Sequence, residues 1–264
     1  MRRDRELDKQ LKRLEKKEFK ILNKEENKLM KTKIAPAVEK IQEKIPEKLN
    51  SALETAFFKG FKLVFEKGLA YIDKTYNKEK LKMEYAYNNS EVNRKMNWRR
   101  MRKLDKTSRH SQTVSSLISV VEGGVLGAFG IGLPDIPLFI SVIIRNIYEI
   151  AYSYGYNPEK DEEREYILLL ICGAITKGQR QKEFNEKIDL AGRRLDLNIQ
   201  SEINLEDQMR ETAKVLSESM LTAKFVQGIP VVGAVGGIVN YSIIKRIGEY
   251  SSLKYKKRYL NRKK

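Results

Sequence analysis

The chain has 264 residues and is strongly basic, with 52 Lys and Arg against 35 Asp and Glu and a formal net charge of +17. It contains one cysteine, Cys172, and one histidine, His110, which excludes an internal disulfide and a zinc site built from several histidines. Hydrophobic residues make up 41% of the chain, enough for a folded core. The first residues are basic with no apolar run behind them, so we expect no secretory signal and a cytoplasmic location.

The N-terminal segment is dense in charge and carries a thin apolar stripe. Leucines recur at heptad-like spacing from Leu7 to Leu14, and Glu18 interrupts the stripe. This pattern predicts a long amphipathic helix, which either packs loosely on the body of the protein or forms a coiled-coil arm. We expect residues 1–33 to be a charged helical extension of a main domain that spans residues 34–264.

Residues 34–75 carry a stronger apolar periodicity, with Pro46 inside it. Since proline breaks a helix but is tolerated in a first turn, we expect a break near Ile45 and a second helix that begins at Pro46. Residues 76–91 are polar and rich in tyrosine, which indicates a connection that holds one short helix. The mixed charges of residues 177–210 likewise indicate a connection with helical stretches.

Two long stretches are almost free of charge. Residues 117–144 hold only Glu122 and Asp135 as charged residues, and residues 225–244 hold none. Gly-Leu-Pro and Gly-Ile-Pro interrupt the two stretches, so we expect shorter apolar helices that meet at these points. The residues that mark the interruptions are Gly132, Pro134, Asp135, Gly228 and Pro230. Each stretch is either a buried helical hairpin in the core or a segment that inserts in a membrane.

The rest of the chain predicts further helices. One helix is expected to end at Gly155, and the next to follow Asn157 and Pro158 with an acidic first turn and the apolar body YILLLICGAI. The apolar residues Val215, Leu216, Met220 and Leu221 predict another amphipathic helix. No strand pattern competes with these helices, so the predicted fold class is all-α.

Two basic blocks flank the uncharged stretches. Residues 92–110 hold eight Lys and Arg and one acid, and residues 245–264 hold nine and one. If both uncharged stretches lay at a bilayer, both blocks would lie on its cytoplasmic side, where anionic lipid attracts Lys and Arg. The predicted membrane-binding or anion-binding residues are Arg94, Lys95, Trp98, Arg99, Arg100, Arg102, Lys103, Lys254, Lys256, Lys257 and Arg258.

Other functions fit parts of this pattern. Clustered Lys and Arg also bind nucleic acid, although no helix-turn-helix, zinc-finger or RNP signature is present. An enzyme would have to use Glu122, Asp135 and Arg145, but the sequence favours a structural ion pair and a helix N-cap as the roles of these residues. Cys172 lies in the apolar run LLLICGA and is expected to be buried. We predict no metal site and no cofactor.

Five stretches of the chain together carry a similarity to a known family. They are IPEKL at 45–49, FEKGLAYIDKTY at 65–76, GIGLPDIPLFISVIIRNIYEIAYSYGY at 130–156, EREYILLLICGA at 163–174 and GIPVVGAVGGIVNYSIIKRIGEYSSLKYKKRYL at 228–260. They resemble the EcsC protein family of bacteria, from about Ile34 to Leu260, and leave residues 1–33 unexplained. The founding member is encoded beside an ABC transporter, and the family has no agreed activity. The resemblance therefore implies a cytoplasmic or membrane-peripheral protein and brings no catalytic residues.

The leading hypothesis is a non-enzymatic accessory protein that is peripheral at the cytoplasmic face of the cell membrane and is linked to an ABC transporter or to protein secretion. Its basic residues would bind anionic lipid, and its apolar segments would insert or contact a membrane protein. A nucleic-acid-binding module is the second hypothesis, and an enzyme with an unfamiliar site is the third.

Overall fold

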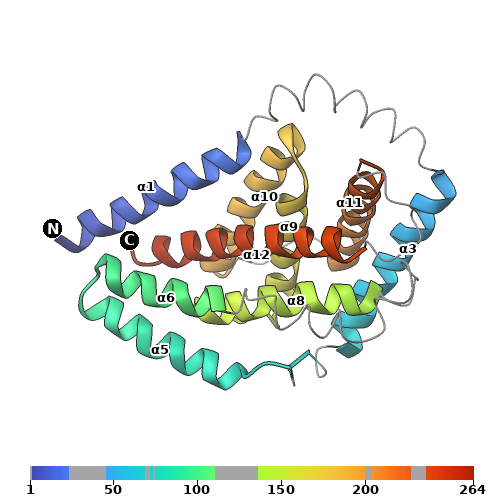
Figure 1. Cartoon of the computed structure of the whole chain (residues 1–264). Coiled ribbons are helices and arrows are strands. Elements are labelled where there is room, and N and C mark those ends of the chain that lie inside the picture. The colour runs from blue at the N-terminus through green and yellow to red at the C-terminus, as the bar shows by residue number, and fades with distance from the viewer. Residues whose placement is uncertain are drawn as a thin grey trace.

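The computed structural model describes residues 2–23, 46–68, 72–73, 75–110, 136–199, 204–226 and 236–264. These residues form helices with short connections and contain no strand, which confirms the all-α class predicted from the sequence. The helices are α1 (Arg2–Leu22), α3 (Glu47–Leu63), α5 (Lys78–Arg94), α6 (Trp98–His110), α8 (Ile136–Ser153), α9 (Asp161–Ile175), α10 (Gly178–Asp196), α11 (Leu205–Val226) and α12 (Gly236–Asn261), and the π-helical segment η2 (Val64–Gly68) continues α3 (Figure 1).

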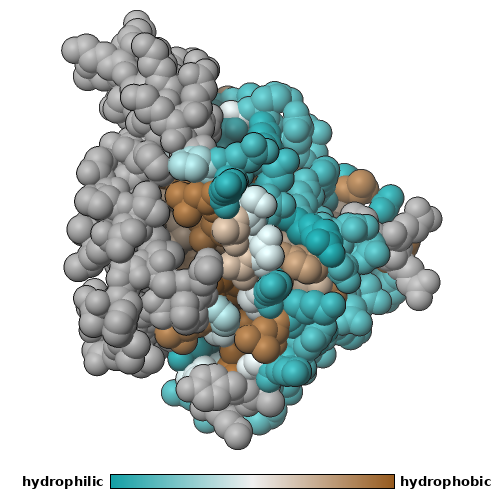
Figure 2. Space-filling model, turned by 90° about the vertical axis from the view of Figure 1, so that its right-hand side faces the viewer, coloured by the Kyte–Doolittle hydropathy of each residue, from teal (hydrophilic) through white to brown (hydrophobic). Residues whose placement is uncertain are grey.

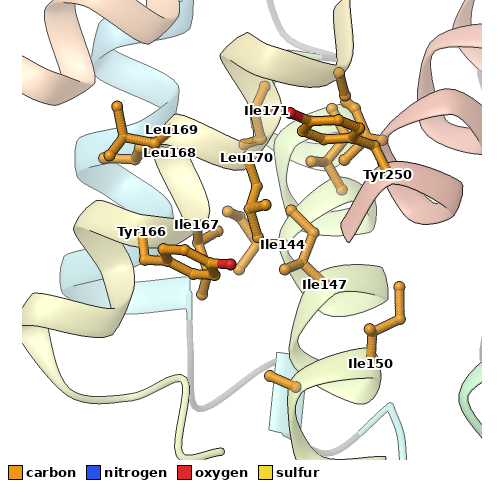
Figure 3. Close-up of a cluster of buried hydrophobic side chains, with 14 of the residues drawn as sticks. Ile144, Ile147, Ile150, Tyr166, Ile167, Leu168, Leu169, Leu170, Ile171 and Tyr250 are labelled. Carbon is orange, nitrogen blue, oxygen red and sulfur yellow. The ribbon is translucent and has the colours of Figure 1, made fainter. Parts of the chain in front are cut away.

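The core is built around α9, which packs against α10, α11 and α12. Every residue from Tyr166 to Ile175 is buried. Ile144, Ile147 and Ile150 of α8 are fully buried with this segment (Figure 3). A helix that is apolar on all sides has to be enclosed by protein or by lipid, and here protein encloses α9.

Helix α8 begins within the first nearly uncharged stretch and includes its last nine residues, 136–144. Among the residues that the structure describes, it is the one helix that is long and apolar enough to cross a membrane. However, 78% of it is buried inside the protein, where it contacts α3, α5 and α12. Ile136–Ser153 therefore has its apolar surface covered by other helices of the same chain.

In the second stretch, residues 225–226 end α11 and residues 236–244 begin α12. Residues 117–135 of the first stretch and 227–235 of the second fall outside the described ranges. This applies to all five residues that mark the Gly-Pro interruptions and to the acid in the first stretch, namely Gly132, Pro134, Asp135, Gly228, Pro230 and Glu122.

Several predicted helix boundaries are confirmed. Pro46 immediately precedes α3, as its tolerance in a first turn predicts. Gly155 ends α8 with a φ of 79°, and a Cβ atom there would lie 2.1 Å from the ring of Tyr85. The acidic first turn of the next helix is also present in α9, at Asp161, Glu162 and Glu163.

Two segments are more helical than predicted. Residues 76–91 do not form a connection with one short helix, because α5 covers most of them and continues over 17 residues. The side chain of Asn77 accepts a hydrogen bond from the backbone N–H of Lys80 (2.8 Å), which begins this helix. Within residues 177–210, α10 is a single helix of 19 residues. In both helices few apolar residues face the core, so their periodicity was hidden among charged residues.

Helix α1 confirms the amphipathic pattern at the N-terminus and packs on α12 and α10. Leu7, Leu11 and Leu14 are all buried. The structure thus agrees with a helix packed on the body of the protein and not with a projecting arm.

Hydrophobic residues also gather on the side of the molecule where α3 and α11 lie. Figure 2 shows this face, with a hydrophobic patch near its centre and hydrophilic residues beside it. In Figure 1 this side is at the right, whereas α6 lies toward the left. The patch and the first basic block therefore lie toward different ends of the fold.

Candidate functional site

Helix α6 presents the first basic block to solvent. The side chain of Asn97 accepts a hydrogen bond from the backbone N–H of Arg100 (3.0 Å), which satisfies one donor in the first turn. Met101 and Leu104 lie in the core, with 1% and 0% of their surface exposed. Because cations occupy most of the remaining positions, α6 has an apolar face toward α5 and α8 and a cationic face toward solvent.

We use the name cationic face for the exposed Lys and Arg that run from the end of α5 along α6. They are Arg94, Lys95, Arg99, Arg102, Lys103 and Lys106. Arg94 lies 3.5 Å from Glu91, whereas the other five have no carboxylate at ion-pair distance among the described residues. Trp98 is 49% exposed, and the guanidinium carbon of Arg102 lies 5.2 Å from the centre of its ring. Arg100 differs from its neighbours, since it is half-buried and pairs with Glu91 at 3.1 Å.

The second basic block has the opposite environment. Its four predicted anion-binding cations lie on α12, and only 1% of Lys254, 9% of Lys256 and 7% of Arg258 is exposed. The fourth, Lys257, has 19% of its side chain exposed. Each of the four forms an ion pair with a carboxylate of this chain.

The expectation that these four cations face an anionic ligand does not fit this environment. A charge that is removed from water has to be paired inside the protein, and here the partner carboxylates are already in place. Lys254, Lys256, Lys257 and Arg258 therefore join helices of this chain through ion pairs.

Four charges join α1, α10 and α12, and we call them the four-charge cluster. Lys254 bonds to Glu18 and, at 2.8 Å, to Asp189. Lys257 bonds to the other oxygens of the same two carboxylates, at 2.7 Å and 2.9 Å. Burial alone would raise the pKa of Asp189, but Lys254 and Lys257 outweigh burial and hold that pKa below its usual value.

Sequence reasoning had treated Glu18 as an interruption of the apolar stripe. It lies four residues after Leu14, in phase with the buried leucines, and is itself 7% exposed. An acid at a core position of an amphipathic helix predicts a buried cation opposite it, and this was the signal that could have located the cluster.

Arg258 is held by two carboxylates and stacked against aromatic rings. Its guanidinium group bonds to Glu163 at 2.6 Å and to Asp196 at 2.9 Å. The rings of Tyr156 and Tyr166 have their centres 4.2 Å and 4.4 Å from its central carbon, which is the geometry of a cation–π contact. Burial would lower the pKa of Arg258, but Glu163 and the other neighbours raise it, so the side chain stays charged.

Lys256 connects α12 to α6. Its ammonium group lies 2.7 Å from the carboxylate of Asp105, which also accepts a hydrogen bond from the hydroxyl of Tyr154 at 3.2 Å. The one acid of the first basic block, Asp105, is therefore paired with a cation of the second block. Its carboxylate is engaged by Lys256 and not by the cations of α6.

Of the three residues considered for an enzyme site, the structure describes only Arg145. The Nε of Arg145 donates a hydrogen bond to Glu149, one turn further along α8, at 2.8 Å. Its proposed partners Glu122 and Asp135 lie outside the described residues. Arg145 thus forms an ion pair with an acid of its own helix, one that the sequence analysis did not name.

Cys172 is fully buried, as expected from the sequence. Its thiol donates a hydrogen bond to the hydroxyl of Thr212 (3.4 Å), and burial raises its pKa to about 12. A thiol with this pKa stays protonated near neutral pH and is a poor nucleophile. Within the described ranges no three His, Cys, Asp or Glu side chains come together as metal ligands would.

The fold and these sites can be compared with known proteins. The model of the EcsC protein family matches residues 8–260, so the chain belongs to this family. The match begins within α1, earlier than the resemblance predicted. Two relatives come from Bacillus subtilis: Protein EcsC is 27% identical over 135 residues, and the uncharacterized protein YdbA is 28% identical over 156 residues. These matches cover 50% and 56% of this chain and 53% and 54% of the relatives.

The chain thus matches about half the length of these relatives. No solved structure matches the chain. The family assignment consequently supplies no activity for this chain.

Proposed function

We propose that this EcsC-family protein is a non-enzymatic accessory protein that binds anionic lipid at the cytoplasmic face of the cell membrane. The observation that carries the proposal is the cationic face, where five of six cations have no carboxylate partner among the described residues. Each Lys or Arg near an anionic leaflet contributes about 1 kcal/mol of binding free energy. Trp98, half-exposed among these cations, is the residue type that prefers the boundary between lipid and water.

The proposal uses one basic block and not two. The C-terminal block no longer supports it, because its four cations are paired inside the protein. The hydrophobic patch of Figure 2 does not enter the proposal either, since it lies toward the other end of the fold.

Lipid explains more of the sequence near α6 than nucleic acid does. Six residues separate the end of α6 at His110 from the nearly uncharged stretch at 117–144. Phosphate groups of a nucleic acid would account for the cations but not for an adjoining apolar, glycine-rich segment. The link to an ABC transporter or to protein secretion, which the family resemblance implies, remains part of the proposal.

Vesicle binding tests this proposal. The purified chain is sedimented with vesicles of phosphatidylglycerol or of phosphatidylcholine at low and at physiological salt. We expect binding to the anionic vesicles alone, with an affinity that falls as salt rises.

A triple variant of the cationic face tests whether this surface is responsible. Arg99→Gln, Arg102→Gln and Lys103→Gln together remove three charges and are expected to weaken binding about a hundredfold, from about 1 kcal/mol for each charge. The matched control removes three exposed cations elsewhere, with Lys59→Gln, Lys67→Gln and Lys182→Gln. Equal loss in both triple variants would show that only net charge matters and would overturn the proposed surface.

The same protein is tested against duplex DNA and single-stranded RNA. Tight binding to either nucleic acid at physiological salt, without binding to anionic vesicles, would replace the membrane proposal by the nucleic-acid hypothesis.

A further inference from the structure

A hollow lies between α1 and α6 on the cationic side of the molecule. Its volume is about 350 Å³, and it is lined by Gln10, Trp98, Met101, Arg102 and Asp105. Pockets that accept small molecules measure about 300–1,000 Å³, so this one suits a small group. Apart from Met101, each lining residue brings a polar group, which suits a polar ligand and not an acyl chain.

The charges around the hollow favour an anion. Asp105 is already paired with Lys256 (2.7 Å) and bonded by Tyr154, so its negative charge is met from within the protein. The amide nitrogen of Gln10 donates to Glu6 at 2.8 Å. Arg102, in contrast, has no carboxylate partner among the residues that the structure describes, and it is exposed.

Two further cations reinforce this charge. Arg99 and Lys103 lie on either side of Arg102 along α6, and both are exposed. Arginine offers a planar fork of N–H donors that matches the oxygens of a phosphate group, and neighbouring cations strengthen such binding.

Trp98 indicates how the hollow would lie against a membrane. Its ring lines the hollow, is 49% exposed and lies under the guanidinium group of Arg102 at 5.2 Å. A tryptophan in this position can lie among the glycerol and carbonyl groups of a leaflet while Arg102 reaches the phosphate.

We infer that this hollow seats the phosphate-bearing headgroup of one anionic glycerophospholipid, with Arg102 as the phosphate ligand. The inference rests on the proposed function and refines it, because it places one lipid molecule in a defined site on a surface that otherwise attracts the leaflet by charge alone. Free phosphate shares the same chemistry, so the test has to separate the two.

Trp98 is the single tryptophan of the chain and therefore reports on the hollow without a label. Its fluorescence is followed while the whole protein is titrated with glycerophosphoglycerol, which is the headgroup of phosphatidylglycerol without acyl chains. Inorganic phosphate and glycerol are titrated in parallel. We expect a saturable change with glycerophosphoglycerol, a weaker one with phosphate and none with glycerol.

Substitution of Arg102 tests its role as the phosphate ligand. Arg102→Gln should weaken the headgroup titration about tenfold or more, since a hydrogen bond to a charged group is lost. Arg102→Lys keeps the charge but lacks the planar fork of donors. Its affinity for glycerophosphoglycerol should lie between those of the original chain and of Arg102→Gln. Lys59→Gln removes an exposed cation of α3 and should leave the titration unchanged. Should a variant of Arg102 fold poorly, competition in the unmodified chain tests the site itself: glycerophosphoglycerol should displace the protein from anionic vesicles, and no displacement at saturating glycerophosphoglycerol would overturn the headgroup site.

The outcomes separate this inference from the proposed function. Vesicle binding without any saturable response to glycerophosphoglycerol would overturn the headgroup site and leave membrane binding intact. Phosphate binding as tight as that of glycerophosphoglycerol would show a site for the free anion and would also overturn it. Absence of both vesicle and headgroup binding would remove the proposed function itself.

Discussion

The two basic blocks of this chain are similar in composition and lie in opposite environments. On α6 the cations are exposed, and most of them have no carboxylate partner among the described residues. On α12 they are buried and paired. The apolar residues around the cations explain the difference: those of α6 occupy one side, whereas α12 also buries Ile247, Tyr250 and Tyr255. A run of positive charge stays exposed to solvent only where one side of its helix is free of apolar residues.

The sharpest test of this contrast removes one arginine from each block. Arg258→Met leaves Glu163 and Asp196 without their cation in a buried site, so the free energy of unfolding should fall by about 3–5 kcal/mol. Arg102→Met removes an exposed cation and should change the free energy of unfolding by less than about 0.5 kcal/mol. Urea denaturation followed by circular dichroism measures both. Similar values for the two variants would contradict the contrast.

Glu18→Gln tests the four-charge cluster at the α1 side. It leaves Lys254, which is 1% exposed, with Asp189 as its one remaining carboxylate partner among the described residues, and we expect the free energy of unfolding to fall by about 2 kcal/mol. Hydrogen exchange should rise along α1 while α9 stays protected, because the loss is local to the docked helix. Glu15→Gln changes an exposed acid on the same helix and is the control. Unchanged protection of α1 in Glu18→Gln would show that the leucine stripe alone docks the helix.

Gly248→Ala tests how closely α12 is enclosed near its middle. The added Cβ would lie 2.7 Å from the Nδ2 atom of Asn146, a fully buried side chain of α8. Overpacking of this kind is expected to lower the free energy of unfolding by about 1.5 kcal/mol. The double variant with Asn146→Ala should recover part of the loss, since the clashing amide is removed. A single variant as stable as the original chain would mean that α8 and α12 are further apart than described.

The smallest effect concerns pH. Because the pKa of Asp189 is lowered in the folded protein, its stabilising contribution is present above its ordinary value of 3.8 and is lost as the pH falls through the folded pKa. The pKa of Lys257 is raised by Glu18 and Asp189 despite burial, so its contribution is lost only as the pH rises above 10.5. The stability difference between the chain and Asp189→Asn should therefore stay constant from about pH 5 to about pH 9 and shrink below that range. A decrease already near pH 7 would contradict the assigned partners.

The sequence was sufficient for the fold class and for most helix boundaries. Pro46, Gly155 and the acidic turn at 161–163 act through local geometry, and local geometry is readable in a single sequence. The full extents of α5 and α10 were not readable, because tertiary packing and not a strong apolar stripe determines them.

For the candidate site, the sequence located the cationic face but could not separate it from the C-terminal block. The partners of Lys254 and Arg258 are distant in the sequence: Glu18 lies 236 residues from Lys254, and Glu163 lies 95 residues from Arg258. Such pairs form only when the helices pack, so neither composition nor periodicity indicates them. Gln10 was missed for the same reason, since it meets α6 only across the hollow.

The most direct test of the central claim, that the cationic face rests on an anionic leaflet, uses Trp98 with lipids brominated at different depths of the acyl chain. Bromine quenches a tryptophan only at short range, and Trp98 is the single one in the chain. In phosphatidylglycerol vesicles we predict quenching of the bound protein that is strongest for bromine close to the glycerol backbone and weaker toward the bilayer centre. A protein that binds these vesicles while Trp98 stays unquenched at every depth would contradict the claim, because another surface would then face the membrane.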